Sequence, residues 1–89
     1  MASRKPVLIF ARDLTEARAY AKSEGMGQEW LFARDLSEPV RYHAGPIAVL
    51  PGFVENERHG LLAPLAEMLE EENGPYVPNS ATPQFPIGA

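Results

Sequence analysis

VLIFARDLTEARAYAKSEGMGQEWLFA, residues 7–33, is the stretch of sequence that decides the fold. It opens with a continuous apolar run, Val7 to Ala11, which is rich in β-forming residues and typical of a strand buried on both faces. Residues 29–33, EWLFA, form a second strand pattern, and a helical pattern lies between the two. Short connections around one helix predict a βαβ unit with parallel strands and a right-handed crossover.

The helical pattern carries a start signal and a stop signal. Asp13, with Glu16 three residues later, resembles a capping box, and Thr15 is an alternative cap. Apolar residues then share one face of the helix: Leu14, Ala17 and Ala21. Gly25 is well placed to end the helix, because glycine adopts the left-handed conformation that helix ends require.

Two longer elements follow this unit. PIAVL, residues 46–50, predicts a third strand that stops before Pro51 and Gly52. An apolar stripe at helical spacing then predicts a second helix: Leu61, Leu62, Leu65, Met68 and Leu69. Pro64 leaves two alternatives, either a helix that begins near Leu61 with Pro64 in its first turn, or a longer helix that kinks at Pro64.

These patterns predict a small α/β domain over residues 1–72, with a β-α-β-β-α order. We expect an open, mainly parallel, Rossmann-like sheet of three strands in the order 2-1-3. Residues 73–89 contain four prolines and no charged residue, which favours an extended or disordered tail. Apolar side chains of this tail, Tyr76 and Phe85 among them, could dock on a neighbour in extended form.

Composition narrows the classes of function. The 89 residues contain no cysteine, which removes disulfides, thiolate nucleophiles and cysteine-bound metals, and is compatible with a reducing cytoplasm. No apolar stretch is long enough to span a membrane, and no signal peptide is expected before the first strand. The net charge of −4 argues against nonspecific nucleic-acid binding, which depends on Lys and Arg.

The pentapeptide FARDL occurs twice, at residues 10–14 and 32–36. Each copy ends a predicted strand, and parallel strands end at the same edge of a sheet. The second copy is expected to start only a short turn or 3₁₀ segment capped by Ser37, since Pro39 follows it closely. Ligands of open α/β sheets bind at this carboxyl edge. The candidate binding residues are therefore Arg12, Asp13, Arg34, Asp35, Phe53, Glu55 and Asn56; helix caps and local ion pairs are the alternative role for them.

Motifs for specific chemistry are not apparent. The turn after the first strand has no glycine, so neither phosphate-binding fingerprint is present. Three carboxylates, Asp13, Asp35 and Glu55, could gather to hold Mg²⁺, and a zinc site could be assembled from His43, Glu55 and His59, but no spacing supports either. No serine has the setting of a nucleophile. We therefore predict no catalytic residue, no metal and no cofactor, and we do not expect an enzyme.

Trp30 and Phe32 share one face of the second strand, where they either join the core or lie on a poorly covered sheet face. If one layer of helices covers the sheet, the exposed apolar face predicts a homodimer or another protein partner. The candidate interface residues are Trp30, Phe32, Tyr76 and Phe85.

The segments VLIFARDLTEARAYAKSEG, EWLFA and IAVLPGF together resemble the small Rossmann-like accessory proteins of actinobacterial phages, over roughly residues 5–57. The resemblance implies an accessory role in the host cytoplasm through binding of a host protein, and it brings no catalytic residues. A binding protein of this kind is our leading hypothesis. The alternatives are a nucleotide or small-anion binder that uses the carboxyl edge, and a nucleic-acid-binding module that uses basic residues: Arg4, Lys5, Arg18, Lys22 and Arg41.

Overall fold

The computed structural model describes residues 6–77 of the chain. Its elements follow in the order β1 (Val7–Phe10), α1 (Leu14–Ser23), β2 (Trp30–Phe32), α2 (Glu38–Arg41), β3 (Ile47–Val49), the 3₁₀ helix η1 (Pro51–Glu55) and α3 (His59–Asn73). The predicted α/β fold is confirmed; α2 lies where a short turn was expected after the second FARDL copy, and η1 is a short helical segment that was not predicted. Most of the predicted tail, including Phe85, lies outside the described residues.

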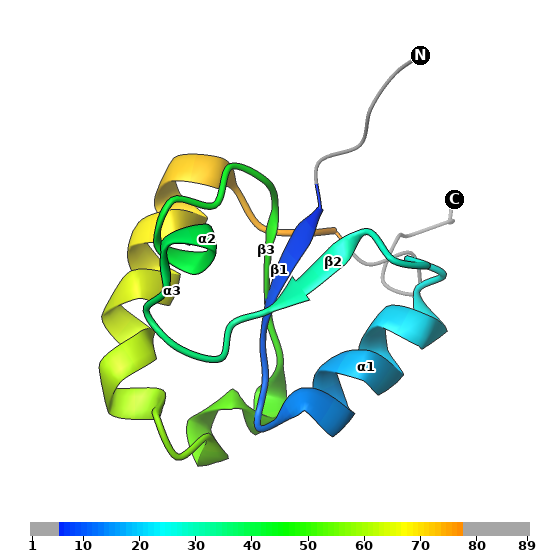
Figure 1. The fold of residues 1–89 in the computed structure, drawn as a ribbon, viewed down its shortest axis with the longest axis horizontal. Coiled ribbons are helices and arrows are strands. Elements are labelled where there is room, and N and C mark those ends of the chain that lie inside the picture. Colours follow the sequence, from blue (N-terminus) through cyan, green and yellow to red (C-terminus); the bar gives the residue numbers. More distant parts are fainter. Residues whose placement is uncertain (1–5, 78–89) are drawn as a thin grey trace, which may run out of the picture.

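The sheet has three parallel strands in the order β2-β1-β3, as predicted (Figure 1). Val7 pairs with Trp30 on one side of β1, and Leu8 pairs with Ile47 on the other. The central strand is buried along its whole length, which explains its unbroken apolar sequence. Both FARDL copies therefore leave the sheet at the same edge.

Helices cover both faces of the sheet, so the molecule has three layers (Figure 1). Ala17 and Ala21 of α1 pack with Ile9 on one face. On the other face, Leu62 and Leu69 of α3 form a cluster with Leu8, Phe10 and Val40. Within residues 6–77 the sheet thus has no bare face, and the condition on which we based a sheet-face dimer is not met. On this second face the helical layer consists of α3 and the connection that contains α2.

Helix α1 begins and ends as its sequence predicts. Asp13 is the N-cap, and its Oδ1 accepts the backbone N–H of Glu16 at 2.9 Å. Glu16 differs from a capping box, because its carboxylate accepts the N–H of Arg12 rather than that of Asp13. At the other end Gly25 has φ +68°. The N–H groups of Gly25 and Met26 reach back to the carbonyls of Lys22 and Ala21, which makes a Schellman motif.

The second FARDL copy starts α2, a single turn, as Pro39 led us to expect. Ser37 occupies the N-cap position, but its side chain makes no capping bond. Asp35 takes over this local role, because its Oδ1 accepts the N–H of Ser37 at 3.0 Å.

Helix α3 begins at His59, two residues before Leu61, so the longer of the two alternatives is observed and Pro64 lies in the helix interior. The apolar stripe is also narrower than predicted. Leu62 and Leu69 are buried, whereas Leu61 and Met68 are 54% and 44% exposed. Ala66, which the stripe left out, is buried between the two leucines. The smaller side chain allows α3 to pack closely on the sheet.

The chain after α3 returns to the sheet beside β3. Gly74 ends the helix with φ +86°, and its carbonyl accepts the N–H of Ile47 at 3.1 Å. The carbonyl of Ile47 in turn accepts the N–H of Tyr76 at 2.7 Å, so Pro75 forms a parallel bridge with Ile47. The Tyr76 ring packs edge-on against Tyr20 of α1. The first residues after α3 therefore occupy the start of the β3 edge.

Candidate functional site

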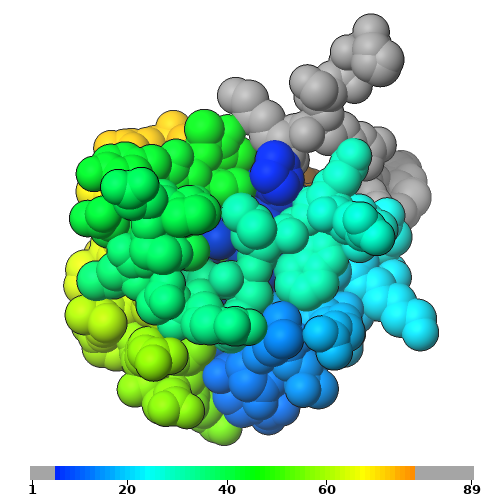
Figure 2. All heavy atoms as spheres, in the orientation of Figure 1, coloured from blue at the N-terminus to red at the C-terminus, as the bar shows by residue number. Residues whose placement is uncertain are grey.

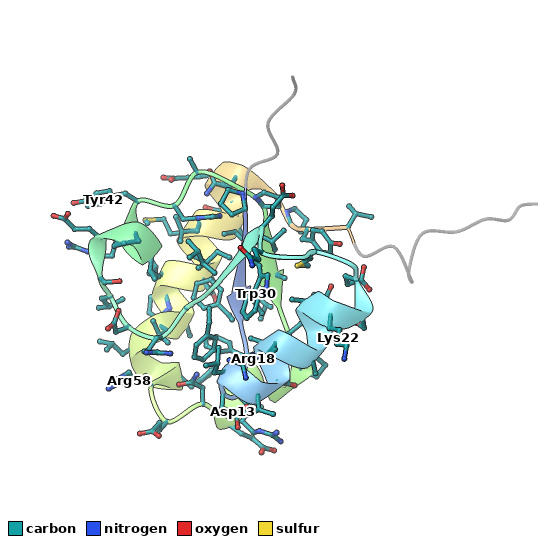
Figure 3. All side chains as sticks on the ribbon, turned by 45° about the vertical axis from the view of Figure 1, so that its right-hand side comes forward. Asp13, Arg18, Lys22, Trp30, Tyr42 and Arg58 are labelled. Atoms are coloured by element: carbon teal, nitrogen blue, oxygen red, sulfur yellow. The ribbon has the colours of Figure 1, made fainter. Side chains whose placement is uncertain are left out.

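The carboxyl edge of the sheet brings together four of the predicted residues. Arg12, Asp13, Arg34 and Asn56 line a hollow of about 200 Å³ in company with Leu14, Phe32, Glu57 and Arg58. In Figure 3, Asp13 and Arg58 lie at the same end of the molecule, at the starts of α1 and α3. Arg58 was not among the sequence candidates. Its only signal was its place directly after the β3 exit, next to Asn56 and Glu57.

The side chain of Asn56 stabilises this edge through hydrogen bonds to the backbone, so its polar atoms are not available to a ligand. Its Nδ2 donates to the carbonyl of Ala11 at 2.7 Å, and its Oδ1 accepts the N–H of Arg58 at 2.6 Å. A guanidinium nitrogen of Arg58 also donates to the carbonyl of Arg34 at 3.3 Å. These bonds tie the ends of β1 and β2 to the start of α3.

Glu16 ties the β1 exit to η1. Its carboxylate accepts the N–H of Arg12 at 2.6 Å and lies against Gly52. A Cβ at Gly52 would meet this carboxylate, so glycine is the residue that allows η1 to lie against the start of α1. The carboxyl edge is thus held by contacts among its own residues.

Three of the predicted residues lie apart from the hollow. Phe53 is 4% exposed and packs edge-on against Phe10 in the core, with 5.3 Å between ring centres. Asp35 is exposed and accepts the N–H of Ser37, and Glu55 is exposed at the end of η1. Neither Asp35 nor Glu55 is among the residues that line the hollow.

Local hydrogen bonds keep the two aspartates of the repeated phrase ionised. The backbone N–H of Glu16 lowers the pKa of Asp13, and the Arg12 side chain, at 3.2 Å, adds to this effect. The N–H of Ser37 is the main cause that lowers the pKa of Asp35, with smaller contributions from Arg58 and Arg34. Because Arg12 is paired with Asp13, and Glu57 adds a second carboxylate, the hollow carries mixed charge.

The described residues do not assemble a metal site. Within residues 6–77, no group of three His, Asp or Glu side chains lies close enough to hold an ion, so Asp13, Asp35 and Glu55 do not gather. His43 is buried beside the start of the sheet, whereas His59 packs on Phe53 near the opposite end of the strands. No helix in this part of the chain is long and apolar enough to cross a membrane.

The outer edge of β2 is the second feature of interest. The carbonyls of Glu29 and Ile9 accept the N–H groups of Val7 and Ala33, which shows that residues 29, 31 and 33 face β1. The backbone groups of Trp30 and Phe32 therefore point away from the sheet. Within residues 6–77 they have no backbone partner. Figure 2 shows the β2 segment at the surface, between α1 and the segment that contains α2.

A groove lies along this side of the molecule, between α1 and the start of β2. Its volume is about 530 Å³, and its lining residues are Arg18, Ala21, Lys22, Gly27, Gln28 and Trp30. The indole Nε1 of Trp30 donates to the carbonyl of Gly27 at 3.1 Å, which fixes the ring. In Figure 3, Trp30 lies over α1, beside Arg18. Arg18 and Lys22 were candidates for nucleic-acid contact, but no pattern in the sequence indicated that they flank the indole.

The candidate interface residues that the structure describes are half-buried against the domain. Trp30 and Phe32 are half-buried and pack on the cluster beneath α1. Tyr76 is half-buried, and its hydroxyl donates to Oε1 of Glu24 at 3.2 Å. Phe85 and the basic residues Arg4 and Lys5 lie outside the described residues. Leu31, which points to the other face of β2, is 39% exposed.

Comparisons with known proteins add no relative from which a role could be carried over. No family model, no curated protein sequence and no solved structure matches this chain. The features that bear on function are therefore the carboxyl edge, the β2 edge and the groove beside it.

Proposed function

We propose that this protein is a non-enzymatic binding module that accepts an extended segment of a partner protein as an additional strand beside β2. The observation that carries the proposal is the row of outward backbone groups at Trp30 and Phe32, which have no partner within residues 6–77. In the setting that the phage-protein resemblance implies, the partner is a protein of the bacterial host.

The chain itself covers most of the rest of the sheet. Helices cover both faces, and residues 74–76 pair with Ile47 at the other edge. Strand addition at an open edge is a common mode of peptide recognition, in which main-chain hydrogen bonds supply affinity. Proteins normally protect such an edge with proline, lysine or a bulge. β2 contains none of these protective features, since its sequence is Trp30, Leu31 and Phe32.

The carboxyl edge supports a weaker alternative. Its hollow is smaller, carries carboxylates as well as guanidinium groups, and is spanned by hydrogen bonds from Asn56 and Arg58. An anion there would have to compete with Asp13 for Arg12. The β2 edge offers backbone groups that need no such displacement.

A matched pair of variants tests the proposal in affinity capture from host lysate. Phe32→Pro removes the outward N–H, and proline is tolerated at this kind of position on an edge strand. Phe32→Ala removes the same ring but keeps the N–H. We expect a protein retained by the native chain and by Phe32→Ala, and lost with Phe32→Pro. The double variant Arg12→Ala/Arg34→Ala is expected to retain it, because the proposal gives the carboxyl edge no role.

Hydrogen exchange on the captured complex provides the direct measurement, and it stands even if Phe32→Pro fails to fold. Binding should slow exchange of the Trp30 and Phe32 amides, because their N–H groups gain acceptors in the partner strand. Capture that depends on Arg12 and Arg34, with no change in exchange at β2, would overturn the proposal in favour of the carboxyl edge.

A further inference from the structure

The groove beside β2 is electropositive, although the chain as a whole has a net charge of −4. Arg18 and Lys22 line it, and no carboxylate is among the residues that do so. Within residues 6–77 neither cation forms an ion pair. The guanidinium of Arg18 and the ammonium of Lys22 therefore face solvent on the side of the molecule that carries the indole of Trp30 (Figure 3).

We infer that the segment that pairs with β2 is acidic, with carboxylates at alternate positions that face Arg18 and Lys22 and apolar side chains at the positions between. This inference rests on the proposed function, because it describes the chemistry of the added strand. Side chains of a strand alternate between the two faces of a sheet. Those on the Trp30 side would meet α1 and the groove, and those on the other side would meet Leu31, which is 39% exposed.

The spacing of the two cations suits an extended peptide. Arg18 and Lys22 are one helical turn apart, and four residues at about 1.5 Å each separate them by roughly 6 Å along α1. Two strand residues on the same face are about 6.7 Å apart. Carboxylates at positions i and i+2 of the added strand can therefore each reach one cation. Acidic residues three positions apart would point to opposite faces, so only one of each such pair would reach this side.

A peptide fits this surface better than a nucleic acid does. Single-stranded nucleic acid would use the indole for stacking and the two cations for phosphates, but it has no N–H and C=O row to pair with Trp30 and Phe32. The groove also has only two cationic side chains among its lining residues, which is few for binding a long polyanion. The exposed side of α3 carries several glutamates, Glu67, Glu70, Glu71 and Glu72, which add to the repulsion of a long anionic chain.

Three heptapeptides with blocked termini provide the probes: VEVEVEV, EVVEVVE with the same composition but no two acids at positions i and i+2, and VKVKVKV with the opposite charge. Trp30 is the only tryptophan of the chain, so its fluorescence reports on the groove directly. We expect a saturable change with VEVEVEV, a change several-fold weaker with EVVEVVE, and none with VKVKVKV. Binding should also slow exchange of the Trp30 and Phe32 amides.

Charge variants separate the groove from the strand edge. Arg18→Gln and Lys22→Gln should each weaken binding of VEVEVEV by about two- to fivefold at low salt, the range for one exposed ion pair, and the double variant should weaken it further. Arg41→Gln is the matched control. It removes an exposed cation from α2, on the opposite face of the sheet, and should leave the affinity unchanged.

The possible results are distinguishable. Slowed exchange at β2 with equal affinity for VEVEVEV and VKVKVKV would overturn the acidic preference and leave strand addition intact. A Trp30 response without slowed exchange would overturn strand addition. No response to VEVEVEV up to millimolar concentration, or a response to an oligo-dT strand in its place, would overturn the inference.

Discussion

At the scale of single residues, the bonds that shape the carboxyl edge come from side chains that the sequence presents as candidate ligand-binding groups. Asp13 and Asp35 accept backbone N–H groups two or three residues ahead, and Asn56 joins two segments far apart in the chain. The sequence could place Arg12, Asp13, Arg34 and Asn56 at one edge, because parallel strands end together. It could not show that the side-chain amide of Asn56 is hydrogen-bonded within the chain, since that depends on how η1 turns back toward Ala11.

Replacing Asn56 tests its bridging role. Asn56→Ala leaves the carbonyl of Ala11 without its side-chain donor, and we expect a loss of about 1–3 kcal/mol in the free energy of unfolding. Asn56→Asp is the matched control, because its carboxylate can still accept the N–H of Arg58 but cannot donate to Ala11. Urea unfolding should show both variants destabilised. Native-like stability of Asn56→Asp would show that the bond to Ala11 contributes nothing.

The buried histidine predicts a pH dependence of stability. Burial is the main cause that lowers the pKa of His43, opposed by the backbone carbonyls of Pro6 and Pro46. Its Nε2 is buried without a hydrogen-bond partner in the described part of the chain. The unfolded chain therefore binds the proton more readily than the folded chain does. The resulting stability is fully present above the unfolded pKa of about 6.5 and falls as the pH drops below it.

Thermal unfolding between pH 5.5 and 7.5 measures this effect. The midpoint should fall toward pH 5.5 in the native chain, and the slope should flatten in His43→Gln. His59→Gln retains His43 and should keep the slope. A slope that survives in His43→Gln would assign the effect to another group.

At the scale of elements, features set by local sequence were predictable, and features set by contacts between distant segments were not. β1 and α1 follow from an apolar run and from caps that act locally. The interior Pro64 of α3 and the exposure of Leu61 and Met68 depend on where the helix meets the sheet, which no local pattern encodes. The groove beside Trp30 was hidden for the same reason, because it joins residues of α1 to residues before β2.

The open edge of β2 predicts an alternating pattern of amide exchange in the free protein. The N–H of Ala33 donates to Ile9 at 2.9 Å, and the register places Leu31 toward β1 as well. Trp30 and Phe32 point outward. We expect slow exchange at Leu31 and Ala33 and fast exchange at Trp30 and Phe32, measured residue by residue by NMR. Protection of all four amides would mean that the edge is already covered in the free chain.

At the scale of the whole molecule, helices on both sides remove the bare sheet face on which a dimer was first argued. The boundary between domain and tail also looks different in the structure. Gly74 to Tyr76 pair with Ile47, and Tyr76 contacts Tyr20 and Glu24 of the α1 region, so residues just after α3 belong to the packed unit. The sequence allowed Tyr76 to dock but did not show where, because a proline-rich segment has the same extended pattern whether or not it is paired.

Two shortened chains test the contribution of this segment. A chain that ends at Val77 keeps the contacts of Tyr76. One that ends at Asn73 loses three backbone hydrogen bonds, two with Ile47 and one from Gly74 to Glu70, as well as the aromatic pair. The second should be less stable than the first by about 2–4 kcal/mol in urea unfolding. It should also self-associate in sedimentation, since Ile47 is then unpaired. Equal stability of the two chains would contradict this role.

The unequal edges of the sheet limit the stoichiometry of any assembly made through it. Pairing at β3 is already taken at Ile47, and within residues 6–77 only Val49 has no backbone partner on that side. A partner strand bound at β2 would therefore complete a one-to-one complex. Two copies joined through β2 would form a closed pair rather than a filament, because neither copy would have another full edge to offer.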